Sequence, residues 1–67
     1  MKEIGKIIKS RRKLLNINQI TLSGLADVSI NTLTKIERGE ANPSINVLNK
    51  VLDTLGMEIK ITIKSKL

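Results

Sequence analysis

The chain contains no cysteine and no histidine among its 67 residues. It can therefore form no disulfide, and thiol and imidazole catalysis are both removed. The same absence removes the side chains that bind most transition metals. The sequence has no glycine-rich phosphate loop, and its six acidic residues do not cluster into a pair. We expect neither an enzyme nor a protein with a metal or another cofactor.

Aromatic residues are missing too, since the chain has no Phe, Tyr or Trp. Proteins that bind single-stranded nucleic acid, and many RNA-binding modules, stack bases on those side chains. Twelve basic and six acidic residues nevertheless give a net charge of +6, which favours a polyanionic partner. Lys, Arg, Asn, Ser and Thr can reach the grooves and phosphates of duplex DNA, so the composition favours duplex DNA.

Long apolar runs are also absent. No run approaches the ~18 residues of a membrane span, and the N-terminal stretch lacks the apolar core of a signal peptide. We expect a soluble cytoplasmic protein without a membrane partner. The 67 residues show no linker or repeat and predict a single domain, 1–67, near the lower size limit for a self-sufficient core.

Apolar spacing and helix-ending residues predict four helices within residues 1–56. They run over about residues 2–15, 19–26, 29–38 and 45–55, with Asn16, Asp27–Val28, Gly39 and Gly56 at their ends. Asn18 and Ser44 are the expected N-caps. In the first helix Ile4, Ile7, Ile8, Leu14 and Leu15 lie near helical spacing. Residues expected to face inward in the other helices are Leu22, Leu25, Ala26, Leu33, Ile36, Ile45, Leu48, Val51, Leu52 and Leu55.

The period of the sequence changes at residues 57–63, MEIKITI. Apolar residues alternate here with polar ones, which is typical of a β-strand. The apolar positions are Met57, Ile59, Ile61 and Ile63. A lone strand in a helical chain lacks a partner, and a second copy of the chain can supply one. We therefore expect 57–67 to form a dimerisation strand and tail; a frayed amphipathic tail is the alternative.

Two short helices joined by a tight turn, the second bearing polar groups, are typical of a helix-turn-helix. The segment 19–44 resembles the Xre/Cro/repressor-type helix-turn-helix family. The matching residues are Gln19, Leu22, Ala26, Val28, Ser29, Thr32, Leu33, Ile36, Glu37, Arg38, Gly39, Pro43 and Ser44. The opening IGKIIKSRRKLLNINQ and the closing VLDTLGMEIKI resemble the HipB-like antitoxin branch, whose members end in such a strand.

The resemblance implies roles for individual residues. Gln19 is expected to contact a phosphate at the start of the second helix. Ile30, Asn31, Thr32 and Lys35 lie where the family contacts bases, while Ser29, Thr34 and Arg38 are expected near phosphates. Arg12 and Glu37 occupy positions where the family often has a partly buried ion pair.

Three positions depart from the family pattern. Asp27 stands where the family commonly has glycine, and it tolerates a left-handed backbone less readily. Ser23 replaces a common alanine, and its hydroxyl can bond back to the preceding turn. Ile30 stands where Arg or Gln often reaches a purine edge. It could contact a thymine methyl group instead, or belong to a protein-partner surface.

The resemblance implies a fold of mainly α class, a four-helix helix-turn-helix domain followed by one strand that pairs across a homodimer. It implies a DNA-binding transcription regulator that represses its own operon at a palindromic operator and acts as an antitoxin. The alternatives are an antitoxin that chiefly neutralises a HipA-like kinase toxin, with DNA binding secondary, and a bridging factor that contacts transcription machinery without reading DNA.

Overall fold

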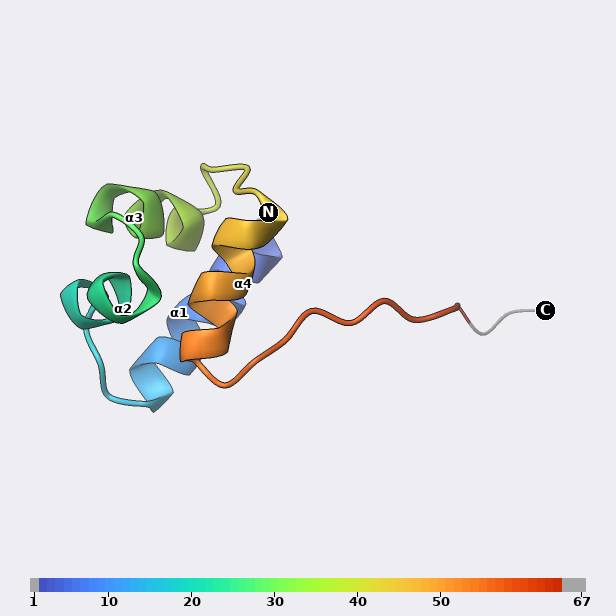
Figure 1. Ribbon diagram of the computed structural model, residues 1–67, viewed down its shortest axis with the longest axis horizontal. Coiled ribbons are helices and arrows are strands. Elements are labelled where there is room, and N and C mark those ends of the chain that lie inside the picture. Colours follow the sequence, from blue (N-terminus) through green and yellow to red (C-terminus); the bar gives the residue numbers. More distant parts are fainter. Residues whose placement is uncertain (1, 65–67) are drawn as a thin grey trace.

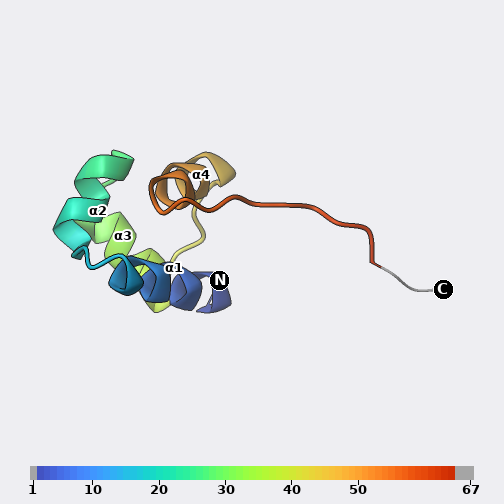
Figure 2. The same ribbon diagram turned by 90° about the horizontal axis from the view of Figure 1, so that it is seen from below.

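The computed structural model describes residues 2–64 (Figure 1). It contains the four helices α1 (Lys2–Leu14), α2 (Gln19–Ala26), α3 (Ile30–Arg38) and α4 (Ile45–Thr54), which confirms the mainly helical prediction. α1 packs against α3, and α2 packs against both α3 and α4. Figures 1 and 2 show the helices gathered at one end of the molecule and the C-terminal segment extending away from them.

Side-chain caps start three of the helices, and two of them, Asn18 and Ser44, are the predicted N-caps. Asn18 Oδ1 accepts a hydrogen bond from the Thr21 backbone N–H at 2.7 Å. Ser29 Oγ accepts from the Thr32 N–H at 3.0 Å, and Ser44 Oγ accepts from the Val47 N–H at 3.2 Å. Each cap satisfies one of the N–H groups that a helix start leaves unpaired.

Left-handed residues end the helices. Asn16 (φ 64°) follows α1, Asp27 (φ 58°) ends α2 and Gly39 (φ 75°) ends α3. At Asp27 the turn is closed by two backbone bonds, from the Asp27 N–H to Gly24 O and from the Val28 N–H to Ser23 O. Asp27 therefore adopts the conformation for which glycine is the commoner choice, as expected from the sequence.

The core lies between the four helices. Its buried apolar residues are Ile8, Leu22, Ala26, Leu33, Ile36, Leu48, Val51, Leu52 and Leu55. Ser23 is buried beside them, and its hydroxyl donates back to Ile20 O at 2.9 Å, as predicted. Gly5 lets α1 approach α3 closely, because a Cβ atom there would overlap the Ile36 carbonyl oxygen.

Two predictions of inward-facing residues are wrong. Leu25 is 67% exposed and Ile45 is 62% exposed. α2 packs on its neighbours through Leu22, Ser23 and Ala26, so Leu25 lies on the uncovered side. Ile45 is in the first turn of α4, whose buried residues come later in the helix. Ile7 and Leu14 of α1 are also exposed, as is Leu15, which follows the end of that helix.

The predicted strand is not formed within residues 57–64, which are extended and have no paired neighbour in the single chain (Figure 1). The Met57 backbone N–H bonds to Leu52 O at 2.8 Å and closes the end of α4. Beyond it the chain leaves the helices, and Ile61 and Ile63 are 98% and 96% exposed. Residues 65–67 of the predicted tail lie outside the described residues. Among the described helices, none is both long and apolar enough to cross a membrane.

Candidate nucleic-acid interface

The outer face of α3 is polar and carries no acidic side chain. Asn31, Lys35 and Arg38 are exposed along it, at positions separated by three or four residues. Residues with this spacing lie on one side of a helix. The only carboxylate of α3, Glu37, is turned into the protein and is 7% exposed. The exposed side of the helix therefore offers one amide and two cations.

The start of α3 adds hydroxyl groups and one apolar side chain. Ser29 Oγ donates to Thr32 Oγ1 at 2.8 Å, so the Thr32 hydroxyl can direct its own proton outward. Ile30 is 43% exposed beside them. The four residues expected to contact bases thus lie on the described helix, with Thr32 less exposed than Ile30, Asn31 and Lys35.

A buried ion pair fixes α3 against α1. Arg12 Nε donates to Glu37 Oε2 at 2.7 Å, and Arg12 Nη2 donates to Glu37 Oε1 at 3.0 Å. The structure therefore brings together, in a two-bond geometry, the two residues that the sequence paired. Arg12 Nη1 also donates to Ile17 O at 3.0 Å, which attaches the loop before α2 to the same pair.

Gln19 extends this pair into a network. Its Nε2 donates to Glu37 Oε1 at 3.0 Å, and its Oε1 accepts from the Thr34 hydroxyl at 3.3 Å. Both Gln19 and Thr34, expected to contact phosphates, are thus engaged inside the protein. The network joins α1, α2 and α3, so it sets the orientation of the outer face of α3 relative to the start of α2.

The charges of the network depend on one another. Burial alone would raise the pKa of the Glu37 carboxyl, but hydrogen bonds from Arg12 and Gln19 and the charges of Arg12 and Lys9 hold that pKa below its ordinary value. The hydrogen bond to Glu37 raises the pKa of Arg12 against the effect of burial. Both groups are charged at neutral pH, and the one carboxylate of α3 therefore contributes no negative charge to the outer face of that helix.

Positive charge continues from α3 onto α1. Lys2, Lys6, Lys9 and Lys13 are all exposed and recur at spacings of three or four residues. Lys13 also lines a small polar cleft with Asn16 and Asn18, next to the first residues of α2. A helix start favours anions, so this end of the molecule suits a phosphate. No group of acidic residues that could hold a metal ion occurs within residues 2–64.

Sequence reasoning missed the contacts of Gln19 and the role of Gly5. Gln19 and Glu37 are 18 residues apart, and neither periodicity nor composition connects them. Gly5 had a usable signal, because an isolated glycine inside a helical pattern often marks a close approach of two backbones.

Comparison with known proteins gives consistent matches. Residues 8–61 match the family described as helix-turn-helix. The chain is 36% identical over 56 residues to the immunity repressor protein of Bacillus phage phi105, a match that covers 84% of this chain but 39% of that repressor. It is 34% identical over 59 residues to the uncharacterized HTH-type transcriptional regulator y4mF of Sinorhizobium fredii, covering 88% of this chain and 78% of the regulator.

Proposed function

Because the chain belongs to the Xre/Cro-type helix-turn-helix family, we propose that it binds duplex DNA sequence-specifically and represses transcription. One observation carries the proposal. The outer face of α3 exposes Asn31, Lys35 and Arg38, while the single carboxylate of that helix is buried and neutralised by Arg12. Such a face is complementary to the negative potential of a DNA groove.

In this proposal α3 enters the major groove. Asn31 can pair with adenine through two hydrogen bonds, Thr32 and Lys35 can bond to base edges, and Ile30 can contact a thymine methyl group. Ser29 and Arg38 lie at the edges of this face and contact phosphates. Gln19 and Thr34 would serve the phosphate backbone only if they exchanged part of their internal hydrogen bonding, so their main contribution is to hold α3 in place.

We propose that the regulator acts as a homodimer on a palindromic operator, since helix-turn-helix dimers place two recognition helices about 34–36 Å apart. The exposed side chains of Ile59, Ile61 and Ile63 support pairing between two copies. A repressor of its own operon fits this arrangement, and its site of action is the cytoplasm.

A second function is favoured by the same C-terminal segment. Its alternating pattern after a helix-turn-helix domain resembles HipB-like antitoxins, and we propose that the protein also neutralises a HipA-like kinase toxin. Co-purification with the product of an adjacent kinase-like reading frame tests this role. Retention of the kinase's full activity in the presence of excess protein would contradict it.

DNA binding is tested by titrating DNA from upstream of the gene at several salt concentrations. If a dimer neutralises about six to ten phosphates, affinity falls about 10³–10⁵-fold between 50 and 200 mM salt. An affinity that does not change over this range contradicts the proposal.

Substitutions then separate the roles. Asn31→Ala should lose about 1–3 kcal/mol of discrimination at one base pair per half-site. Gln19→Ala should weaken binding to all sequences about equally. Asn49→Ala is the matched control, because Asn49 is also exposed but lies on α4. Identical profiles for Asn31→Ala and Gln19→Ala on a randomised site would show that the division of roles is wrong.

A further inference from the structure

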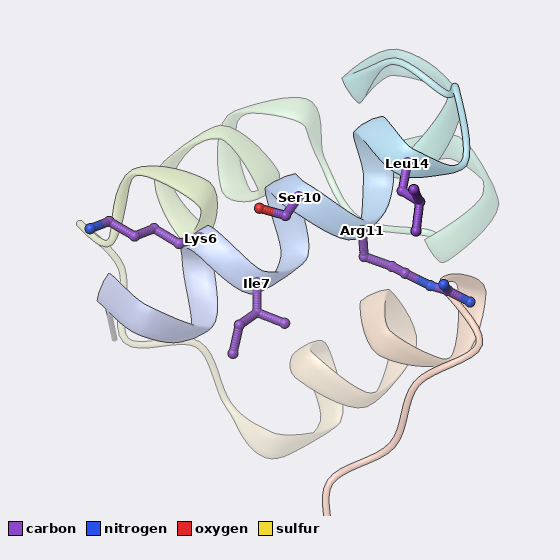
Figure 3. A pocket seen from close by; sticks show the side chains of 5 residues that line it. All are labelled: Lys6, Ile7, Ser10, Arg11 and Leu14. Carbon is purple, nitrogen blue, oxygen red and sulfur yellow. The ribbon is translucent and has the colours of Figure 1, made fainter.

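The face of α1 next to α4 is an uncovered apolar groove (Figure 3). It is lined by Lys6, Ile7, Ser10, Arg11 and Leu14 and has a volume of about 490 Å³. Ile7 is 50% exposed and Leu14 is 74% exposed. The volume lies in the range of small-molecule sites, roughly 300–1,000 Å³, but its lining lacks the converging polar groups of such sites. The groove therefore suits apolar side chains of another polypeptide.

The groove continues to the start of the C-terminal segment. Ile7 also lines an adjoining hollow together with Ile4, Leu48 and Leu52 and with the first residues of the segment, 57–60. Arg11 Nε donates to Leu55 O at 2.9 Å, so the groove ends beside the last residue before Gly56. Met57 and Ile59 thus lie against the helices, while Ile61 and Ile63 extend beyond them with nothing covering them.

We propose that a second copy of this chain occupies the groove, in one defined register. The two 57–63 segments pair antiparallel about a twofold axis at Ile59, so that Met57 of each copy lies opposite Ile61 of the other. This inference rests on the homodimer proposed above. It adds which residues face one another and where the partner's Ile63 binds.

Charge complementarity supports this register. In an antiparallel pair, side chains directly opposite each other point to the same face. With Ile59 opposite Ile59, each Glu58 lies opposite a Lys60, which gives two pairs of opposite charge. A register centred on Lys60 would instead place two lysines opposite each other, which is destabilising. Registers shifted by an odd number of residues would set polar against apolar side chains.

A register centred on Glu58 would set two glutamates opposite each other, which is also destabilising. A register centred on Ile61 is the main alternative. It would place Glu58 opposite Lys64 and avoid like charges. However, it would leave the two Ile61 side chains against each other, midway between the two helical bodies. Centring on Ile59 brings both exposed isoleucines onto the partner's helical body.

The same register brings Ile63 of one copy next to the groove of the other copy. In this register the partner's Ile61 faces Met57, so its Ile63 extends two residues past the end of the ladder, toward the end of α4 at Leu55. Arg11 is bonded to that same Leu55, and Ile7 and Leu14 flank Arg11 in the groove. We place Ile63 against Ile7 and Leu14, while the exposed Lys60 and Thr62 belong to the other face of the ladder. Each copy has one groove and one segment. In a dimer the segment of each copy occupies the groove of the other, so no site is left for a third copy.

Charge reversal tests the register by sedimentation equilibrium of the full chain. Glu58 and Lys60 are exposed, so their variants should fold, which circular dichroism will check. Glu58→Lys and Lys60→Glu should each weaken dimerisation about tenfold, and the double variant should restore it. Lys60→Glu is the sharper variant, because it lowers the net charge and would strengthen dimerisation if only overall repulsion mattered.

Lys64→Glu is the matched control. It makes the same change in net charge at an exposed position outside the proposed ladder, so it should not weaken the dimer. Weakening by Lys64→Glu without rescue in the double variant would overturn the register in favour of the one centred on Ile61. A wild-type dimer that is insensitive to all four variants would overturn the register but leave the homodimer and DNA binding standing. A wild-type monomer would overturn the homodimer as well.

Cross-linking tests the groove. The chain has no cysteine, so single cysteines can be introduced cleanly. Mixed Ile63→Cys and Leu14→Cys chains should form a heterodimer with a short bismaleimide. Ile63→Cys mixed with Leu25→Cys should not, although Leu25 is exposed to a similar extent on α2. Equal cross-linking of the two mixtures, or none in either, overturns the assignment of Ile63 to the groove.

Discussion

The helical body, residues 2–56, and the segment that follows it are stabilised in opposite ways. In the body, apolar residues from all four helices are buried together, and the side chains of Arg12, Gln19 and Glu37 bond to one another. In the segment, Ile61 and Ile63 are almost fully exposed, and its backbone has no neighbouring strand. The helices of the body form their backbone hydrogen bonds within one chain, whereas the backbone of the exposed segment is open to water or to another chain.

Apolar content alone does not decide which residues of this chain enter the core. The segment has four apolar residues in seven, a richer share than the 40% of the whole chain. It remains uncovered because a single extended stretch cannot form a second layer over itself. If the segment pairs between two copies as proposed, that pairing depends on protein concentration, whereas the packing of the body within one chain does not.

Removing the segment should give the largest effect. A chain truncated after Gly56 is expected to be monomeric and to bind its operator about 10²–10⁴-fold more weakly, because two linked half-site contacts become independent. Ultracentrifugation and operator titration of residues 1–56 and 1–67 provide the measurement. Ile61→Lys in the full chain should act in the same direction without removing the Met57 bond that closes α4. A truncated dimer with unchanged affinity would place the contact between copies on the helices instead.

Breaking the ion pair between Arg12 and Glu37 should destabilise the helical body. Arg12→Ala leaves the buried Glu37 carboxylate without its main partner, and we expect a loss of about 3–5 kcal/mol in the free energy of unfolding. Urea denaturation followed by circular dichroism suits a chain without aromatic residues. Lys13→Ala, next in sequence and exposed, should change stability little. If both variants lose the same stability, the pair does not hold α1 to α3.

Filling the contact between α1 and α3 should have a smaller effect. Gly5→Ala would press a methyl group against the backbone of α3, where the Glu37 carbonyl oxygen lies 2.9 Å from the added Cβ. The free energy of unfolding should fall by about 1–3 kcal/mol as a result. Gly24→Ala is the matched control, because nothing lies within 4 Å of a Cβ there. Because Gly24 lies within a helix, its replacement by alanine should raise the free energy of unfolding by about 0.5–1 kcal/mol. If the thermal unfolding curves of Gly5→Ala and Gly24→Ala shift in the same direction, the close approach of α1 to α3 at Gly5 is contradicted.

The smallest predicted effect is the contribution of Glu37 to the pH dependence of stability. The pKa of Glu37 is lower in the folded protein than in the unfolded chain, so the folded state favours its charged form. Its stabilising contribution is complete above the unfolded pKa of about 4.3 and is lost as the pH falls through the folded pKa. The free energy of unfolding, measured with urea, should therefore fall less steeply between pH 7 and pH 3 for Glu37→Gln than for the wild type. Glu40→Gln, at an exposed position, should keep the wild-type slope.

Local chemistry made much of the body predictable. Asn18 and Ser44 cap the helices they precede, and Asn16 and Asp27 have the left-handed backbone that their positions require. These features depend on a few neighbouring residues, so the sequence contains the necessary information. The family resemblance similarly pointed to Arg12 and Glu37, which the structure places in contact.

Features that depend on what covers a helix were harder to predict. Leu25 and Ile45 fit an amphipathic pattern, yet α2 and α4 are short and are covered on one side only. The binding of Gln19 to Glu37 and Thr34 requires three helices to be placed first. The segment 57–63 carries a clear strand pattern, but a strand needs a partner that a single sequence does not contain.

The two sides of α3 have one further consequence. Leu33, Ile36 and Glu37 hold the helix to the body, whereas Asn31, Lys35 and Arg38 are exposed, and no residue belongs to both sets. Exchange of the exposed set should therefore leave folding intact while changing which DNA sequence is bound. A library randomised at the exposed residues proposed to contact bases, Ile30, Asn31 and Lys35, could be selected for new operators without compensating changes in the rest of the chain. Under the proposed function, the DNA sequence that is bound can therefore change without a change in the fold.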